Sequence, residues 1–140
     1  MGQKILIIGR GPSGSGKSRM MNNLAGLCCS KTPIILSADD YFIVDGEYQF
    51  DVKKLKDAHA QCQRLADEYM ALEERFVLID NTNTMRWEMT PYLELAEKHG
   101  YEVIIAQTNW KREDVKLYAE RNVHGVPLET IYNQMERWEA

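Results

Sequence analysis

The stretch Ile5-Leu6-Ile7-Ile8-Gly9-Arg10-Gly11-Pro12-Ser13-Gly14-Ser15-Gly16-Lys17-Ser18 decides the fold of this 140-residue chain. It begins with four consecutive Ile and Leu residues, a composition typical of a short strand that is buried on both faces. Residues 11–18 then match the pattern G-x-x-x-x-G-K-S/T at every fixed position. Apolar residues at helical spacing follow, namely Met20, Met21, Leu24, Ala25 and Cys28. The stretch therefore predicts a strand, a glycine-rich turn and a helix in direct succession.

The glycine-rich turn predicts a loop that binds phosphate groups. Glycines let successive backbone N–H groups point inward around phosphate oxygens, and the N-terminus of the following helix adds a positive dipole end. A Gly/Ser turn that binds nothing is the alternative, but the strand before it and the helix after it favour the binding loop. We expect Lys17 to reach the β- and γ-phosphates of ATP and the Ser18 hydroxyl to bind Mg²⁺. The full set of expected nucleotide contacts in the loop is Gly11, Pro12, Ser13, Gly14, Ser15, Gly16, Lys17 and Ser18.

Three further apolar runs repeat the strand pattern along the chain. They are Ile34–Leu36, Phe76–Ile79 and Val103–Ile105, and each is expected to be a buried parallel strand. A helix before the third strand is indicated by a stripe of apolar residues at helical spacing: Leu55, Ala58, Cys62, Leu65, Tyr69 and Leu72.

The second half of the chain carries signals for three more helices. Thr90 before Pro91 predicts the start of one helix, which ends at His99 before Gly100. Another is expected from about Arg112 to Asn122, and a last one begins after Pro127. Strands and helices alternate, so we predict a single α/β domain over residues 1–140. It has three layers, with a parallel sheet of about four strands and helices on both faces.

Composition excludes several classes of protein. The chain has 17 Lys and Arg against 21 Asp and Glu, a net charge of -4, which argues against a nucleic-acid coat protein or a polybasic membrane binder. Cys28, Cys29 and Cys62 are an odd number without metal-type spacing, so reduced thiols in a cytoplasmic protein are expected. His59 and Cys62 lack two further metal ligands, which favours packing for Cys62. The run Ile5–Ile8 is too short to span a membrane.

Two expected strands end in carboxylates. Asp39 and Asp40 follow the second strand, at the sheet edge where ligands of open α/β folds bind. A carboxylate there can accept the proton of a hydroxyl that attacks a γ-phosphate, or it can cap a turn. We favour the base role for Asp39 and the capping role for Asp40. Asp80 closes the third strand, where a carboxylate beside the phosphate loop holds Mg²⁺ directly or through water. Asn81 and Asn83, which follow it, are left without an assigned role.

The segment 110–126 is expected to form a lid over the nucleotide. It carries Lys111, Arg112, Lys116 and Arg121, of which the first three are interleaved with acidic residues and are expected to face solvent. Arg121 lies nearest the Gly125 break and is the residue expected to neutralise charge on the phosphates. The tryptophans Trp87, Trp110 and Trp138 are expected to anchor the core or an interface, and Trp110 is also placed to contact a nucleotide.

The chain resembles the kinase domain of phage-type polynucleotide kinase and the small P-loop kinase-like domains related to it. The matching pieces are spread over nearly the whole sequence and occur in the family's order. They are Gly11–Ser18, Asp39-Asp40-Tyr41, Asp80–Asn83, the segment Ala96–Val103 with Gly100, and Arg121-Asn122 ahead of Val126-Pro127.

The resemblance implies transfer of the ATP γ-phosphate to a 5′-hydroxyl of DNA or RNA. It implies that Lys17 and Ser18 handle phosphate and Mg²⁺, with Asp80 beside the metal and the acceptor. It also implies that Asp39 is the general base and Arg121 a lid arginine. Two departures concern the acceptor side. Phe42 stands where the phage enzyme has an acceptor-site arginine, and the shorter lid lacks a second arginine, His124 being the nearest polar residue.

Three functions are compatible with these residues. The first is a phosphotransferase acting on a nucleic-acid 5′ end. Because the net charge is -4, we expect a local basic groove to bind this end, with an affinity that depends only weakly on salt concentration. The second is a kinase of a small-molecule hydroxyl, with residues 43–56 as the acceptor-side wall. The third is a nucleotide-binding module without turnover. The sequence leaves the oligomeric state open.

Overall fold

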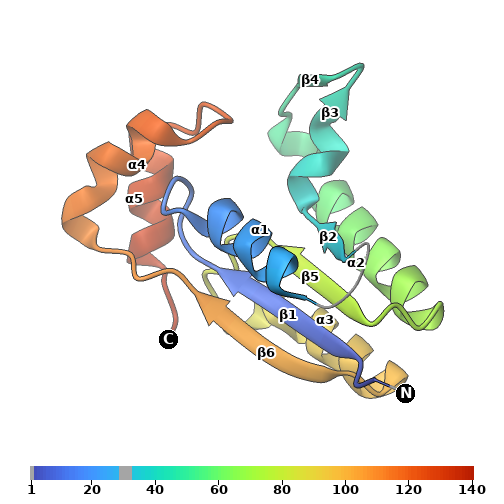
Figure 1. The fold of residues 1–140 in the computed structure, drawn as a ribbon. Coiled ribbons are helices and arrows are strands. Elements are labelled where there is room, and N and C mark those ends of the chain that lie inside the picture. Colours follow the sequence, from blue (N-terminus) through green and yellow to red (C-terminus); the bar gives the residue numbers. More distant parts are fainter. Residues whose placement is uncertain (1, 29–32) are drawn as a thin grey trace.

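Figure 1 shows the computed structural model of the chain, which describes residues 2–28 and 33–140. Four parallel strands form the central sheet: β1 (Ile5–Arg10), β2 (Ile34–Leu36), β5 (Phe76–Asp80) and β6 (Glu102–Gln107). Their order across the sheet is β2-β5-β1-β6. The predicted sheet of about four parallel strands is therefore confirmed.

Helices cover both faces of the sheet, as predicted for three layers. Along β1 the side chains alternate between the faces. Ile7 packs with Met21 and Ala25 of α1 (Lys17–Leu27) on one face. Leu6 and Ile8 pack on the other face against α2 (Leu55–Ala71) and α3 (Arg86–His99). The sequence of β1 is apolar at successive positions because both of its faces are buried.

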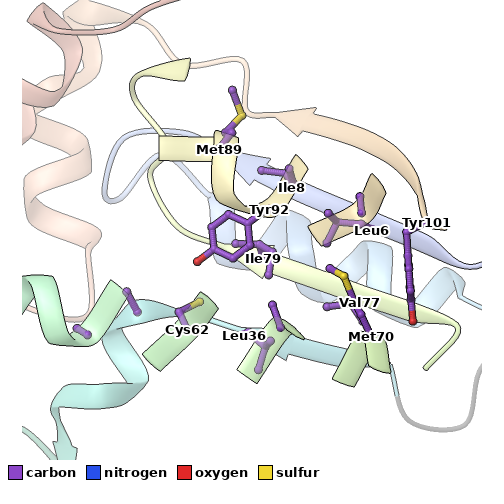
Figure 2. Close-up of a cluster of buried hydrophobic side chains, with 14 of the residues drawn as sticks. Leu6, Ile8, Leu36, Cys62, Met70, Val77, Ile79, Met89, Tyr92 and Tyr101 are labelled. Carbon is purple, nitrogen blue, oxygen red and sulfur yellow. The ribbon is translucent and has the colours of Figure 1, made fainter. Parts of the chain in front are cut away.

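The larger core lies between the sheet, α2 and α3 (Figure 2). Tyr92 of α3 is 1% exposed, and Cys62 of α2 is buried beside it. Burial raises the pKa of the Cys62 thiol, and the packing role expected for this cysteine is confirmed. Among the described residues, no group of three or more His, Cys, Asp or Glu is placed to hold a metal ion. Cys29 lies outside the described residues.

Three expectations about helices need correction. The buried stripe of α2 is Ala58, Cys62, Ala66 and Met70, whereas Leu72 lies beyond the helix and is 72% exposed. The helix predicted to start at Pro91 begins five residues earlier. Glu88 accepts hydrogen bonds from the Met85 backbone N–H (3.2 Å) and the Thr84 hydroxyl (2.7 Å), which fixes that start. Trp87, expected as an anchor, is 68% exposed.

The prediction that every strand is buried on both faces is wrong for β6. Its side chains Val103, Ile104 and Ile105 are 37%, 49% and 49% exposed. β6 pairs only with β1 and forms one edge of the sheet. The helix α3 contacts β6 but leaves these three apolar side chains partly exposed.

The remaining elements surround the carboxyl ends of the strands. Short 3₁₀ helices lie at Ala38–Phe42, Val52–Lys54 and Arg112–Asp114. A hairpin of β3 (Ile43–Val44) and β4 (Glu47–Tyr48) turns at Asp45 and Gly46, both with positive φ. The helices α4 (Val115–Arg121) and α5 (Leu128–Glu136) complete the chain and confirm the two last predicted helices. No helix of the described residues is long and apolar enough to cross a membrane.

Candidate functional site

The three chain segments expected to carry chemistry meet at one edge of the sheet. The glycine-rich loop follows β1, Asp80 ends β5, and Asp39 follows β2. These strands are neighbours and run parallel, so their carboxyl ends lie side by side. The location agrees with the ligand-binding edge of open α/β sheets.

The loop adopts a conformation that only glycine accepts easily. Gly14 and Gly16 have φ values of 78° and 92°, in the left-handed region. A Cβ on Gly14 would lie 2.1 Å from the Tyr118 carbonyl oxygen of α4. Gly16 is the N-cap of α1, so the helix begins at Lys17 with its N-terminus directed at the loop.

Residues from α5 and from the segments after β5 and β6 hold the loop from outside. The Ser13 backbone N–H donates to Oε1 of Gln134 (2.8 Å), and Nε2 of Gln134 donates back to Oγ of Ser13 (3.1 Å). The hydroxyls of Ser15 and Thr108 are 2.9 Å apart. The Gly11 N–H donates to the Thr82 carbonyl at 3.1 Å. The loop is therefore ordered by α5 and by the ends of β5 and β6, which sequence reasoning did not identify.

Lys17, Ser18 and Asp80 form a polar cluster at the start of α1. The Lys17 ammonium lies 3.1 Å from Oδ1 of Asp80, and both side chains are nearly buried, at 13% and 12% exposure. The Ser18 hydroxyl donates to Oδ2 of Asp80 at 2.9 Å. Oδ1 is a buried oxygen that accepts no hydrogen bond beyond this ion pair in the described part of the chain. A hydroxyl and an under-satisfied carboxylate are suitable ligands for a hard cation such as Mg²⁺.

The asparagines after β5 support the site from beneath. Nδ2 of Asn83 donates to the Gly9 carbonyl at 2.8 Å, and Oδ1 of Asn81 accepts from the Ala38 N–H at 2.9 Å. Both side chains are buried. They tie the end of β5 to the ends of β1 and β2, so their role is structural.

Asp39 contacts two aromatic side chains. Its Oδ1 accepts a hydrogen bond from the Tyr48 hydroxyl at 3.2 Å, and its Oδ2 lies 3.7 Å from Nε2 of His124. Asp40 accepts a hydrogen bond from the Ser37 backbone, which agrees with the expected capping role. Partial burial, and then the negative charges of Asp39 and Asp80, raise the pKa of the Asp40 carboxyl. The three carboxylates therefore share one region of negative potential.

Arg121 crosses from the lid segment to the loop. Its Nε donates to the Gly14 carbonyl at 2.7 Å, and its guanidinium lies 5.3 Å from the centre of the Tyr118 ring. Of the other basic residues in this segment, Lys111 and Lys116 are exposed, and Arg112 pairs with Glu136 on the surface. Of the basic residues in segment 110–126, Arg121 is thus the one that the described structure brings to the glycine-rich loop.

Tryptophans anchor the lid segment to the rest of the fold. Trp110 packs edge to face against Trp138 at a ring distance of 5.1 Å, and Trp138 covers the buried Arg10 guanidinium at 4.4 Å. Arg10 donates to the Asn83 carbonyl at 2.8 Å. The anchoring role expected for Trp110 and Trp138 is confirmed, whereas no sequence signal pointed to Arg10.

Comparisons with known proteins agree with this geometry. Residues 6–137 match the sequence model of a family described as an AAA domain. The chain is 40% identical over 136 residues to human NEDD4-binding protein 2, an alignment that covers 96% of this chain. It is 28% identical over 134 residues to 2′,3′-cyclic-nucleotide 3′-phosphodiesterase of Rattus norvegicus, an alignment that covers 91% of this chain. The matched regions are only 8% and 30% of those two proteins.

Solved structures share the fold at low sequence identity. A chain of the Pnkp1/Rnl/Hen1 RNA repair complex matches with a TM-score of 0.74 and 14% identity, covering 98% of this chain and 44% of that chain. The Mycobacterium tuberculosis APS kinase CysC, solved with AMPPNP and APS, matches with a TM-score of 0.62 and 14% identity. This match covers 86% of this chain and 71% of the APS kinase chain. The predicted P-loop kinase-like fold is confirmed. The match over residues 6–137 shows that the chain belongs to the AAA-domain family, and its fold is that of the P-loop kinases.

Proposed function

We propose that the chain transfers the γ-phosphate of ATP to a hydroxyl acceptor, and that the acceptor is the 5′-hydroxyl end of a nucleic acid. The observation that carries the proposal is the arrangement of groups at the sheet edge. Lys17 and Ser18 open α1 beside Asp80, Arg121 reaches the loop from the lid, and Asp39 lies one strand further out. This separates a phosphate-binding side from an acceptor side that has its own carboxylate.

Each residue has a distinct part in the transfer. The loop N–H groups and Lys17 hold the β- and γ-phosphates, and Arg121 neutralises charge that develops on the γ-phosphoryl group. Asp39 accepts the proton of the acceptor hydroxyl. The hydroxyl oxygen then bonds to the γ-phosphorus while the bond between that phosphorus and the β–γ bridging oxygen breaks. The products are ADP and a 5′-phosphate end.

Ser18 and Asp80 are the residues that would hold Mg²⁺, since both present oxygen atoms next to the expected β- and γ-phosphates. When bound, the ion neutralises phosphate charge and orients the γ-phosphoryl group for in-line attack. In the structure, Asp80 pairs with the Lys17 ammonium through Oδ1 and accepts a hydrogen bond from the Ser18 hydroxyl through Oδ2.

Transfer of labelled phosphate tests the proposal. The chain is incubated with γ-labelled ATP, Mg²⁺ and a short oligonucleotide bearing a 5′-hydroxyl, and the same oligonucleotide with a 5′-phosphate serves as control. We expect label only on the first, with loss of at least about 100-fold of the rate in D39N, a typical size for a general base. Retained ATP binding in D39N would show that the loss is chemical. No transfer to the 5′-hydroxyl oligonucleotide at any concentration would refute the proposal.

A small-molecule acceptor is the second candidate, and a cavity beside Asp39's segment favours it. The cavity has a volume of about 360 Å³, and its walls include Tyr41, Phe42, Phe50 and Lys54. This size suits a nucleoside or a similar molecule. Transfer to a nucleoside 3′-monophosphate but to no oligonucleotide would favour this candidate. ATP binding without any transfer, unchanged in D39N, would instead favour a nucleotide-binding module.

A further inference from the structure

Two rings stack against each other above Asp39. The Tyr48 and His124 rings have centroids 4.0 Å apart and an interplanar angle of 26°. Both rings also contact the same carboxylate, because the Tyr48 hydroxyl donates to Oδ1 of Asp39 and Nε2 of His124 lies 3.7 Å from Oδ2. Two side chains thus contact the group that the proposed function uses as its base, and the Asp39 side chain remains 47% exposed.

The stack joins two elements that are far apart in the sequence. Tyr48 lies on β4 of the hairpin, and His124 lies in the loop between α4 and α5 that Figure 1 shows extending toward this hairpin. The two ends of the loop are fixed, because the Asn122 side chain accepts a hydrogen bond from the Val126 backbone N–H (2.7 Å) and donates one to the Val126 carbonyl (3.1 Å). Val123 is 88% exposed, and Gly125 has φ 66° with open space around its Cβ position. The tip 123–125 is therefore the part of the loop that can carry His124 away from Asp39, while Asn122 and Val126 stay bonded to each other.

The acceptor side offers aromatic surface next to the carboxylates of Asp39 and Asp40. Tyr48 belongs to a cluster of aromatic rings. Its ring centroid lies 6.4 Å from that of the nearly parallel Phe50 ring and 6.2 Å from that of Phe42. The carboxylates of Asp39 and Asp40 make the local potential negative, which disfavours a phosphate at this point. Recognition of an acceptor here therefore depends on stacking more than on ion pairs.

We propose that the Tyr48 ring is the stacking platform for the terminal base of the acceptor, and that His124 occupies this platform in the structure. The proposal rests on the proposed function and specifies its substrate class as an acceptor with an aromatic base next to the reacting hydroxyl. The His124 imidazole already lies on the Tyr48 ring at stacking distance, and the base of the acceptor takes the place of this imidazole. Withdrawal of His124 also frees Oδ2 of Asp39 for the acceptor hydroxyl.

The Tyr48 hydroxyl keeps its hydrogen bond to Asp39 while the base is stacked on the Tyr48 ring. Burial, followed by the charge and hydrogen bond of Asp39, raises the pKa of the Tyr48 phenol above its usual range, so the hydroxyl stays protonated and donates to Oδ1. One residue thus orients the carboxylate and seats the base. Ring and hydroxyl can be tested separately by substitution.

Direct binding tests the platform independently of turnover. Two trinucleotides with a 5′-hydroxyl and a 3′-fluorophore are compared by fluorescence anisotropy on the 140-residue chain. One carries a 5′-terminal purine, and the other carries an abasic tetrahydrofuran unit at that position. Stacking of a base on an aromatic ring contributes about 1–3 kcal/mol, so the abasic trinucleotide should bind about 5- to 150-fold more weakly.

Variants assign this difference to the two rings. Y48L should weaken binding of the purine trinucleotide to the level of the abasic one, whereas Y48F should keep the preference for the purine. H124A should bind the purine trinucleotide more tightly and the abasic one unchanged, because the platform is free. E47A, an exposed neighbour on β4, should change neither affinity and serves as the matched control.

The outcomes separate this inference from the proposed function. Equal affinities for the two trinucleotides, or a purine preference that survives in folded Y48L, would overturn the stacking platform. Weaker purine binding in H124A would overturn the displacement of His124. Transfer of labelled phosphate to both trinucleotides at equal KM would also reject the platform while leaving the kinase proposal intact. Absence of transfer with a retained purine preference would reject the kinase proposal alone.

Discussion

At the scale of single residues, the glycine-rich loop depends on the absence of a side chain at Gly14. Gly14 has a positive φ, and a Cβ there would lie 2.1 Å from the Tyr118 carbonyl oxygen, a backbone atom that cannot move aside cheaply. G14A should therefore lower the free energy of unfolding by about 2–4 kcal/mol through backbone strain and overlap. It should also weaken binding of a fluorescent ATP analogue, because α4 and the loop are forced apart. Urea unfolding and an ATP-analogue titration measure the two effects.

Gly26 provides the matched substitution in the same segment. It lies inside α1, and a Cβ on it would meet nothing within 4 Å. G26A should stabilise the protein by up to about 1 kcal/mol, since alanine favours a helix more than glycine does. The nucleotide affinity should not change. Equal destabilisation by G14A and G26A would contradict the special role of Gly14.

At the scale of elements, α5 acts as a support for the glycine-rich loop. Gln134 is 6% exposed and exchanges two hydrogen bonds with Ser13. Q134L preserves helix propensity but leaves the Ser13 N–H and hydroxyl without these partners, which costs about 1–3 kcal/mol. If about 1.4 kcal/mol of this is needed to order the loop for ATP, the Kd for ATP should rise about tenfold. Isothermal titration calorimetry gives this Kd.

The neighbouring Asn133 supplies the control for Gln134, because it is exposed on the same helix. N133L introduces the same side chain without touching the loop and should leave the Kd for ATP unchanged. An unchanged Kd in Q134L as well would show that the loop orders itself without α5.

The helices α2 and α3 are joined by a pH-dependent contact. Asp67 on α2 lies 2.6 Å from Nε2 of His99 and 3.2 Å from the Lys98 ammonium on α3. Hydrogen bonds from His99 and then Lys98 lower the pKa of Asp67 below its usual 3.8. A lowered pKa contributes stability above pH 3.8 that disappears as the pH falls through the folded-state value. We expect the melting temperature of the parent to fall more steeply than that of D67N between pH 5 and pH 3.

The matched variant for D67N is E94Q, which removes a carboxylate from the exposed face of α3. Its melting temperature should follow the parent over the same pH range. If D67N loses melting temperature as steeply as the parent, the contact with His99 and Lys98 has no part in the acid sensitivity.

At the scale of the whole molecule, local signals predicted the sheet and the phosphate loop but not what closes around them. The β1 run and residues 11–18 determine local structure through their immediate neighbours, and the strand, loop and helix that they predict are present. Asp45-Gly46 is a strong hairpin signal, but the flanking strands are only two residues each and show no alternating pattern that would predict them. The start of α3 depends on the hydrogen bond that Glu88 accepts from Thr84, whereas Thr90-Pro91 inside the helix resembles a helix start and so predicts the wrong boundary.

The missed site contacts join residues that are distant along the chain. Ser13 and Gln134 are 121 positions apart, and Ser15 and Thr108 are 93 positions apart. Each of these residues alone is an ordinary polar side chain, and only the packing of α5 and β6 beside β1 brings the pairs together. Tyr48 and His124 belong to the same class, since no periodicity links a hairpin to a lid loop. The acceptor side was therefore the least predictable part of the site.

At high concentration, we expect the β6 edge of the sheet to govern association of the chain with itself. β6 exposes Val103, Ile104 and Ile105 on an unpaired edge, the arrangement that favours pairing with another sheet. I104K should reduce concentration-dependent association in light scattering and leave the Kd for ATP unchanged, because a lysine on an edge strand opposes strand addition. L27K, which removes an exposed leucine (78%) at the end of α1, should not reduce association. An equal reduction in both variants would assign the effect to net charge rather than to the β6 edge.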